Sequence, residues 1–394
     1  MIKSELFRFL RNAKNRIILF ILFIYPLIFV TSIYFQSNSY METQSELHMN
    51  QSRIANIRAL TLERGSDDDF LKDRKELIVF LKEISRNELS AGKFYKSDVE
   101  KNYHFINTSM KKVYLLYLDA LDKGLITEQI ISELGYTQTD LSVKAFYTKY
   151  LEENVEKLIL NVYEINGANG VKLFFSGENI LILMLILVLL LSDIYIKDLI
   201  EGSYKQIYTL SFSRWNIFKA KWIVAVIVFL AIVFYAVIMI FLLTTVIGGI
   251  GDFEYPVISK VFDLNLIEFE NSDFHIISIW QYIAYGILQL IVGAIALITF
   301  VIYSSIRLNS LNNAVGVGFI SLLIVFLINS IMPEYSYMRA IYPFSYLYID
   351  NILNINTYVN GAFGFVSNCT IIIGTLVLCY FNLVKLDLNG IMKD

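Results

Sequence analysis

The sequence predicts an all-α integral membrane protein with six transmembrane helices, an N-terminal interfacial helix and a helical extracellular domain between the first two spans. Apolar residues make up 56% of the chain and charged residues only 18%, and the mean hydropathy is +0.55. A soluble domain averages about 45–50% apolar and about 25% charged residues. A soluble core of this size could not hide so many apolar side chains. The long apolar runs and the scarcity of proline favour helical spans over a barrel.

Six apolar stretches approach the length of about 20 helical residues that crossing a bilayer requires. They are residues 17–35, 174–195, 222–247, 276–302, 314–332 and 363–383. The first stretch is longer than the apolar part of a signal peptide and no small-residue cleavage site follows it, so we interpret it as a retained span. We divide the chain into a connecting helix, a first span, an extracellular domain and a five-span bundle. Their bounds are 1–16, 17–36, 37–172 and 173–394.

The distribution of Lys and Arg predicts the orientation, because these residues concentrate in short cytoplasmic connections. They are frequent before the first span and in the connection 193–221 between the second and third spans, whereas the loop between the third and fourth spans is acidic. We therefore expect a multi-pass protein of the plasma membrane with both termini in the cytoplasm. The frequent use of Ile, Asn, Lys and Tyr is compatible with an AT-rich bacterial genome.

The composition changes abruptly in the segment 37–172, which is rich in charged residues and contains no proline. Within it, apolar residues recur at helical spacing in Leu77-Ile78-x-Phe80-Leu81-x-x-Ile84. We expect a small, all-helical extracellular domain, with most of its charges on a solvated surface.

The first residues of the chain predict a short amphipathic helix. Ile2, Leu6, Phe9, Leu10 and Ala13 fall on one helical face, and basic residues occupy the others. A basic amphipathic helix lies in the headgroup plane with its apolar side toward the acyl chains. We therefore assign Leu6, Phe9 and Leu10 to a membrane contact. The alternative is an ordinary positively charged flank of the first span.

The connection 193–221 contains the pattern Glu201-Gly202-x-x-Lys205-x5-Ser211-x-Ser213-Arg214-x-x-Ile217-x3-Lys221. Together with the order of an N-terminal helix, one span, a large insert and five more spans, this pattern resembles the membrane subunit of type-2 ABC exporters. That family has a similar acidic-Gly…Ser-Arg…Lys pattern between its second and third spans. The resemblance covers the six spans, and the chain departs from the family at Phe212, where the family often has proline.

The resemblance implies that the connection holds a coupling helix, which docks on a separate ATPase subunit around residues 201–212. It also implies that the N-terminal helix, residues 1–14, touches the ATPase, and that Arg214 and Lys221 anchor the next helix at the inner headgroups. The residues expected to carry the coupling are Glu201, Gly202, Lys205, Tyr208, Ser213, Arg214 and Lys221. The loop 333–360 would contain short re-entrant helices at the outer leaflet.

The chain has no motor of its own, since Gly167-Ala-Asn-Gly170 lacks the Lys-Ser/Thr of a phosphate-binding loop and reads as an external turn. We expect a non-catalytic subunit without a cofactor, with ATP and Mg²⁺ bound by a partner. The three His and two Cys form no recognisable metal-ligand set. The net charge of −3 argues against a protein that binds nucleic acid. The expected partners are ABC ATPase subunits, a second permease copy or a paralogue, and membrane lipid.

The function that we expect is that of a permease subunit of an ABC exporter. Its mainly apolar spans favour an amphipathic or hydrophobic cargo, such as a peptide, an antimicrobial compound or a lipid-like molecule. The alternative is a membrane-anchored sensor or immunity protein, whose external domain binds a toxin or peptide without transport. A secondary transporter fits less well, because the span interiors lack charged ion ligands.

Overall fold

In a computed structural model, the chain forms two compact units, which we describe separately. The residues described are 1–64, 71–96, 99–126, 131, 138–155, 161–195, 197, 213–260, 274–308, 311–332, 337–349 and 361–391. The first unit, the membrane bundle, comprises Met1–Thr31, Asn166–Phe269 and His275–Asp394. The second unit, the insert, comprises Ser32–Ile165 and Glu270–Phe274.

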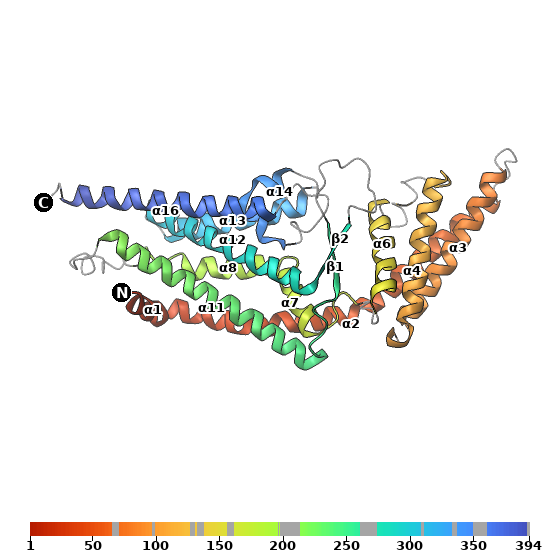
Figure 1. The fold of residues 1–394 in the computed structure, drawn as a ribbon, viewed down its shortest axis with the longest axis horizontal. Coiled ribbons are helices and arrows are strands. Elements are labelled where there is room, and N and C mark those ends of the chain that lie inside the picture. The colour runs from red at the N-terminus through yellow and green to blue at the C-terminus, as the bar shows by residue number, and fades with distance from the viewer. Residues whose placement is uncertain are drawn as a thin grey trace. The chain divides into compact units, whose positions relative to one another are not determined.

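The membrane bundle is almost entirely helical (Figure 1). Its helices are α1 (Ile2–Arg11), the first part of α2 (Ala13–Arg64), α7 (Gly167–Phe175), α8 (Asn179–Leu191), α11 (Arg214–Gly248), α12 (Ile279–Leu308), α13 (Leu311–Ile331), α14 (Tyr337–Ile341), the 3-10 helix η3 (Pro343–Leu347) and α16 (Gly361–Ile391). The strands β1 (Pro256–Lys260) and β2 (Phe274–Ser278) pair in a two-stranded sheet. The short helices α14 and η3 fall within the loop 333–360, for which the family resemblance implies short helices; their re-entrant position at the outer leaflet stays a prediction.

Five of the described helices, α2, α11, α12, α13 and α16, are long and apolar enough to cross a membrane. The helices α7 and α8 pass the same test together, although they are bent by 65° at the break between them. Counted as one broken span, this pair brings the number to six. The chain is therefore a mostly helical, multi-pass membrane protein, as the sequence predicts.

The break between α7 and α8 has a local cause. Ser176 ends α7 with extended backbone angles, and Gly177 follows with φ of 65°, in the left-handed region that favours glycine. Asn166 caps the beginning of α7, because its side chain accepts a hydrogen bond from the Asn169 backbone nitrogen at 2.8 Å. The expected external turn at residues 167–170 is thus the buried first turn of a helix. A Cβ at Gly170 would come within 2.6 Å of the Thr244 side chain on α11, so this glycine permits a close approach.

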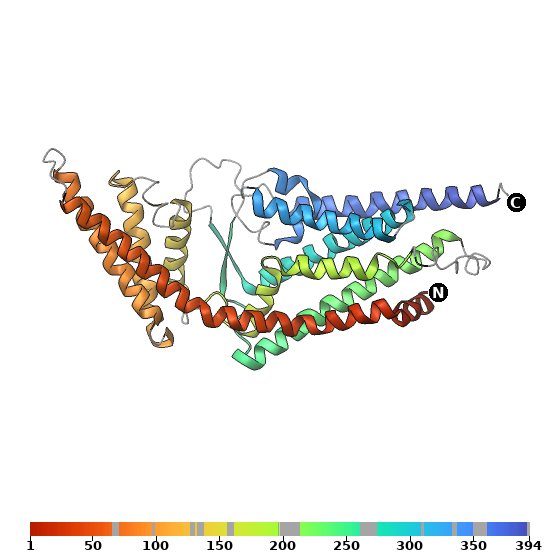
Figure 2. The same ribbon diagram turned by 180° about the vertical axis from the view of Figure 1, so that it is seen from behind.

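Several chain segments meet at one end of the membrane bundle. Helix α1, the last turns of α8, the first turns of α11 and the C-terminal part of α16 all lie there, as Figure 1 and Figure 2 both show. Helix α7, η3 and α14 lie at the opposite end. An even number of crossings, which the sequence predicts, requires α7 and α8 to count together as one span. That the end of the bundle with α1 faces the cytoplasm stays a prediction.

Helix α2 does not end at residue 36, where the sequence places the end of the first span. It continues without interruption to Arg64, through Pro26 near its beginning. The rest of α2 joins α3 (Leu71–Lys96), α4 (Val99–Asp122) and α6 (Gln138–Asn154) in the insert. The insert has its own hydrophobic core, to which α3 contributes Phe80, Leu81 and Ile84 at the helical spacing read from the sequence.

A polar cluster lies inside the insert, where α2 packs on α3. His48 Nδ1 lies 2.7 Å from Glu88 Oε2, and the two side chains are only 4% and 0% exposed. The Tyr95 ring stacks on His48 with a centroid distance of 5.4 Å. Ser45 Oγ donates a hydrogen bond of 2.7 Å to the Gly92 carbonyl oxygen. Side-chain hydrogen bonds of this kind fix the register of two helices that approach closely.

Candidate functional site

The N-terminal helix is separated from the first membrane helix by a single residue, Asn12. Its backbone is extended (φ −65°, ψ 125°), and its Oδ1 accepts a hydrogen bond of 3.2 Å from the Lys14 backbone nitrogen. Asn15 Nδ2 donates a hydrogen bond of 3.0 Å to the Phe9 carbonyl oxygen, which also accepts one of 3.3 Å from the Asn12 backbone nitrogen at the end of α1. These two asparagines therefore hold a defined turn between α1 and α2.

The apolar face expected on α1 is divided between two environments. Phe9 is buried in the bundle, and α1 contacts α11. Leu6 is half-buried, whereas Leu10 and its neighbour Phe7 are exposed. Of the residues assigned to a membrane contact, Phe9 thus anchors the helix to protein and Leu10 remains on the outer surface. The exposed fraction of Phe7 is 64%, so α1 presents its own apolar surface away from the bundle.

The amino group of Lys221 joins three segments of the chain. Lys221 lies in α11 and is only 4% exposed. Its Nζ donates a hydrogen bond of 2.9 Å to the Ile194 carbonyl oxygen, just after α8, and lies 3.8 Å from Glu5 Oε2 on α1. It also lies 5.9 Å from the centroid of the Tyr195 ring. The structure thus shows the ammonium group bonded to protein groups, and the anchoring of α11 at the inner headgroups, which the family resemblance implies for Lys221, stays a prediction.

A second ion pair ties the beginning of α2 to the end of α8. Lys14 Nζ lies 2.7 Å from Asp193 Oδ2 and donates a hydrogen bond of 2.9 Å to the Leu189 carbonyl oxygen. Leu189 lies in the last turn of α8, where the unpaired carbonyl groups favour a nearby cation. Asp193 is buried, and Lys14 is partly exposed. We call the region built by these contacts among α1, the beginning of α2, the end of α8 and the first turns of α11 the N-terminal junction.

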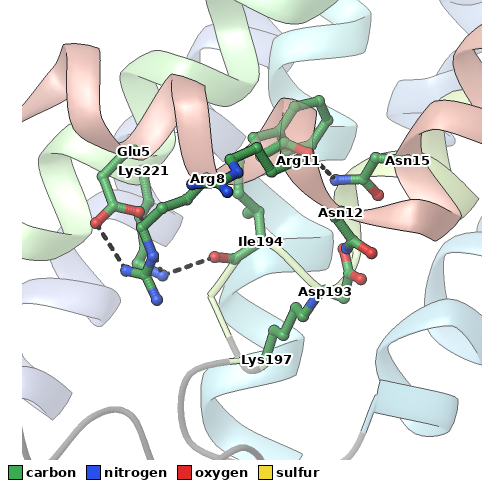
Figure 3. A pocket seen from close by; sticks show the side chains of 10 residues that line it. Glu5, Arg8, Arg11, Asn12, Asn15, Asp193, Ile194, Lys197 and Lys221 are labelled. Atoms are coloured by element: carbon green, nitrogen blue, oxygen red, sulfur yellow. Dashed lines mark hydrogen bonds and ion pairs between the residues drawn. The ribbon is translucent and has the colours of Figure 1, made fainter.

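The N-terminal junction contains an open cavity of about 250 Å³, most of whose lining residues are charged or polar (Figure 3). It is lined by Glu5, Arg8, Phe9, Arg11, Asn12, Asn15, Asp193, Ile194, Lys197 and Lys221. Figure 3 shows the Glu5–Arg8 ion pair and the hydrogen bond from Lys221 to Ile194 on its wall. Four cationic and two anionic side chains line the described part of the cavity, so its wall carries an excess of positive charge.

The predicted coupling residues are only partly within the described part of the chain. Ser213, Arg214 and Lys221 are described, while Glu201, Gly202, Lys205 and Tyr208 lie outside it. Ser213 caps α11, since its Oγ accepts a hydrogen bond of 3.3 Å from the Asn216 backbone nitrogen. Arg214 is the first residue of α11 and is half-buried.

Sequence reasoning missed the partners of Lys221 and Lys14. Glu5 received no role, although it is the only acidic residue before Glu42. An isolated carboxylate in a basic segment is a signal for an ion pair, and here it binds Arg8 at 3.2 Å. We placed Asp193 at the end of a span but could not identify Lys14 as its partner. The two residues are far apart in sequence, and only the tertiary fold brings them together.

A second cavity, of about 220 Å³, lies between α8 and α13 and has almost entirely apolar walls. Its lining residues are Glu178, Leu181, Ile182, Leu185, Phe319, Leu322, Leu323 and Phe326. Glu178 precedes the first turn of α8 and is exposed, so the carboxylate stands at one end of the groove. This groove can accept an acyl chain or another apolar group, but it has few polar atoms that could orient a ligand.

No group of three or more His, Cys, Asp or Glu side chains that could hold a metal ion is present among the described residues. Cys369 and Cys379 are free thiols. Comparison with protein-family models, with curated proteins and with solved structures found no match to the chain.

Proposed function

We propose that this chain is the permease subunit of an ATP-driven ABC exporter, coupled to a separate ATPase through the connection between α8 and α11. The bonding of Lys221 supports this more than any other observation. Its ammonium group binds the Ile194 carbonyl oxygen, at the beginning of that connection, and approaches Glu5 on α1. The first turns of a membrane helix are thereby joined to the two segments on which an ATPase subunit would act.

A buried contact of this kind transmits displacement well. If its groups separate without water to replace the partner, they lose their hydrogen bonds in a medium of low dielectric constant. A movement of the connection 193–221 would therefore carry α11 and α1 with it. Lys14 extends the link to α2 through Asp193. ATP binding to the partner would in this way shift several spans together.

In this proposal, the ATPase docks on the part of the connection that lies outside the described residues. Glu201, Gly202, Lys205 and Tyr208 would contact the ATPase, and Ser213 and Arg214 would fix the beginning of α11. The ATPase would bind ATP and Mg²⁺, two permease copies would form the path, and both termini would face the cytoplasm. The apolar groove between α8 and α13 supports an amphipathic or hydrophobic cargo.

Identification of the partner is the first test. The full chain should be purified from its native membrane in a mild detergent, and a co-purifying nucleotide-hydrolysing subunit is expected. The charge reversal Glu201→Lys should reduce that co-purification. If no ATPase accompanies the wild-type chain, the proposal is wrong.

The second test concerns Lys221. In the purified complex, Lys221→Met should leave the ATPase bound but lower its permease-dependent hydrolysis by about tenfold, which corresponds to ~1.4 kcal/mol and lies within the usual range of coupling free energies. Lys219→Met is the matched control, because Lys219 is exposed on the same helix. Equal effects of the two substitutions would contradict a specific role of the buried ammonium group.

The insert favours a second candidate function, that of a sensor or immunity protein. It forms a compact unit with its own hydrophobic core, which a binding domain requires. Deletion of residues 37–164 discriminates between the two candidates. A sensor would lose all function and would not require the ATPase, whereas an exporter would retain permease-dependent ATP hydrolysis.

A further inference from the structure

The cavity of the N-terminal junction has the chemistry of a binding site for an anionic phosphate group. Arg8, Arg11, Lys197 and Lys221 lie on its wall, against the carboxylates of Glu5 and Asp193. Both carboxylates already bind cations, because Glu5 contacts Arg8 and Lys221, and Asp193 contacts Lys14. Within the described residues, positive charge therefore exceeds negative charge, and an anion is the ligand that this wall favours.

The size and openness of the cavity fit a group larger than water. Its volume of about 250 Å³ far exceeds the roughly 10–15 Å³ that a single water molecule needs. Arg8 and Arg11 are both exposed, so their guanidinium groups can reach a ligand that enters from outside. Guanidinium groups bind phosphate oxygens through paired, charge-assisted hydrogen bonds.

The surroundings of the cavity identify the source of the phosphate. Asn15 lines the cavity, and the next turns of α2 present Ile17, Phe20 and Ile21 as exposed apolar side chains. On the other side, α1 exposes Phe7 and Leu10. A molecule with a phosphate group and apolar chains could thus place its headgroup in the cavity and its chains along α2.

We propose that the N-terminal junction binds the headgroup of an anionic glycerophospholipid as a resident ligand. The phosphate contacts Arg8 and Arg11, and the acyl chains cover the exposed apolar side chains at the beginning of α2. Basic pockets between membrane helices bind anionic headgroups in this manner. This inference does not depend on the coupling to an ATPase, since it requires only that α2 crosses a membrane.

The test uses the purified full chain alone, delipidated in detergent. Native mass spectrometry should detect one retained phosphatidylglycerol molecule per chain after titration, and no comparable retention of zwitterionic phosphatidylcholine. The double variant Arg8→Gln, Arg11→Gln should weaken the binding about 25-fold, because each basic residue near an anionic membrane surface contributes roughly a factor of five.

The matched control is the double variant Lys3→Gln, Arg16→Gln. It removes the same charge from the first 16 residues of the chain, but neither residue lines the cavity and both are exposed. The control should bind phosphatidylglycerol within about twofold of the wild type, and thermal unfolding should establish that both variants are folded. An equal loss in the control would overturn the proposal, because a diffuse surface field would then explain the binding.

A competition experiment distinguishes a lipid headgroup from a soluble phosphate compound as the ligand. Glycerol 3-phosphate and inorganic phosphate share the anionic group but have no acyl chains. Neither should displace phosphatidylglycerol at concentrations comparable with that of the lipid. If either binds the delipidated chain as tightly as the lipid does, the site takes a soluble phosphate compound and the lipid proposal is wrong.

Discussion

The insert and the membrane bundle bury their ionisable groups in different places. In the insert, Glu88 and His48 lie between two helices in the interior of a helical unit. In the described part of the bundle, the buried charged side chains are Asp193, Lys221 and Arg339, and all three lie near the ends of helices. Charges within a bilayer are costly unless they reach the interface or a partner. The contrast teaches that the bundle keeps its buried charges where helices end, whereas the insert holds a buried polar pair in its interior.

Loss of the carboxylate in the insert should have the largest effect on stability. Glu88→Leu removes the hydrogen-bonding partner of the buried His48 ring, and a buried polar group left without its partner costs up to about 3 kcal/mol. Thermal or denaturant unfolding followed in the insert measures this loss. Glu83→Gln is the control, because Glu83 is exposed on the same helix and its substitution should change stability by less than about 0.5 kcal/mol.

The double variant His48→Leu, Glu88→Leu sharpens the comparison. Replacing both partners by apolar residues is often close to neutral, so the double variant should recover much of the stability that Glu88→Leu loses. A double variant less stable than Glu88→Leu would show that each side chain stabilises the insert independently of the other.

Replacement of Arg339, which lies at an end of the membrane bundle, should cause the next largest loss of stability. Its Nη2 donates hydrogen bonds of 3.0 and 2.8 Å to the carbonyl oxygens of Asn329 and Met332, where α13 ends. Cations near a helix C-terminus stabilise these unpaired groups. Arg339→Met should cost about 1.5–3 kcal/mol, the usual contribution of hydrogen bonds to a charged group. Unfolding in detergent measures the loss, with Arg16→Met as the exposed control.

The sequence predicts the class of the fold well, because apolar stretches of the required length are a direct physical signal. Phe80, Leu81 and Ile84 also enter the core at the predicted spacing. The break at Gly177 and the helical start at Asn166 were not predicted, because both depend on local backbone geometry. The N-terminal junction was predicted only in part, since its ion pairs join residues that are far apart in sequence.

The tyrosines of the insert core predict how its stability depends on pH. Burial raises the pKa of Tyr117 above its ordinary value, and the neighbouring Glu88 carboxylate raises it further. The unfolded chain therefore loses this proton first, near pH 10. The stabilisation is fully present below pH 10 and is lost progressively as pH rises toward the folded pKa, with a slope of about 1.4 kcal/mol per pH unit.

Tyr117→Phe isolates this contribution. The phenylalanine variant keeps the ring but cannot ionise, so its stability should fall less steeply between pH 10 and 11 than that of the wild type. Denaturant unfolding of the insert at pH 9, 10 and 11 provides the measurement. Parallel curves for the two proteins would show that another group dominates the alkaline transition.

Of all these substitutions, replacement of Lys14 should change stability least. Its distance from the Asp193 carboxylate nevertheless equals the distance between His48 and Glu88 in the insert. Lys14 Nζ lies 2.7 Å from the carboxylate, but its side chain is 37% exposed. Water can replace a partly exposed partner, and such pairs contribute about 0–1 kcal/mol. Lys14→Gln should therefore destabilise the bundle by less than about 1 kcal/mol in detergent, and added salt should reduce the difference. A loss as large as that of Glu88→Leu would mean that water does not reach this end of the bundle, and the contrast between the two units would fail.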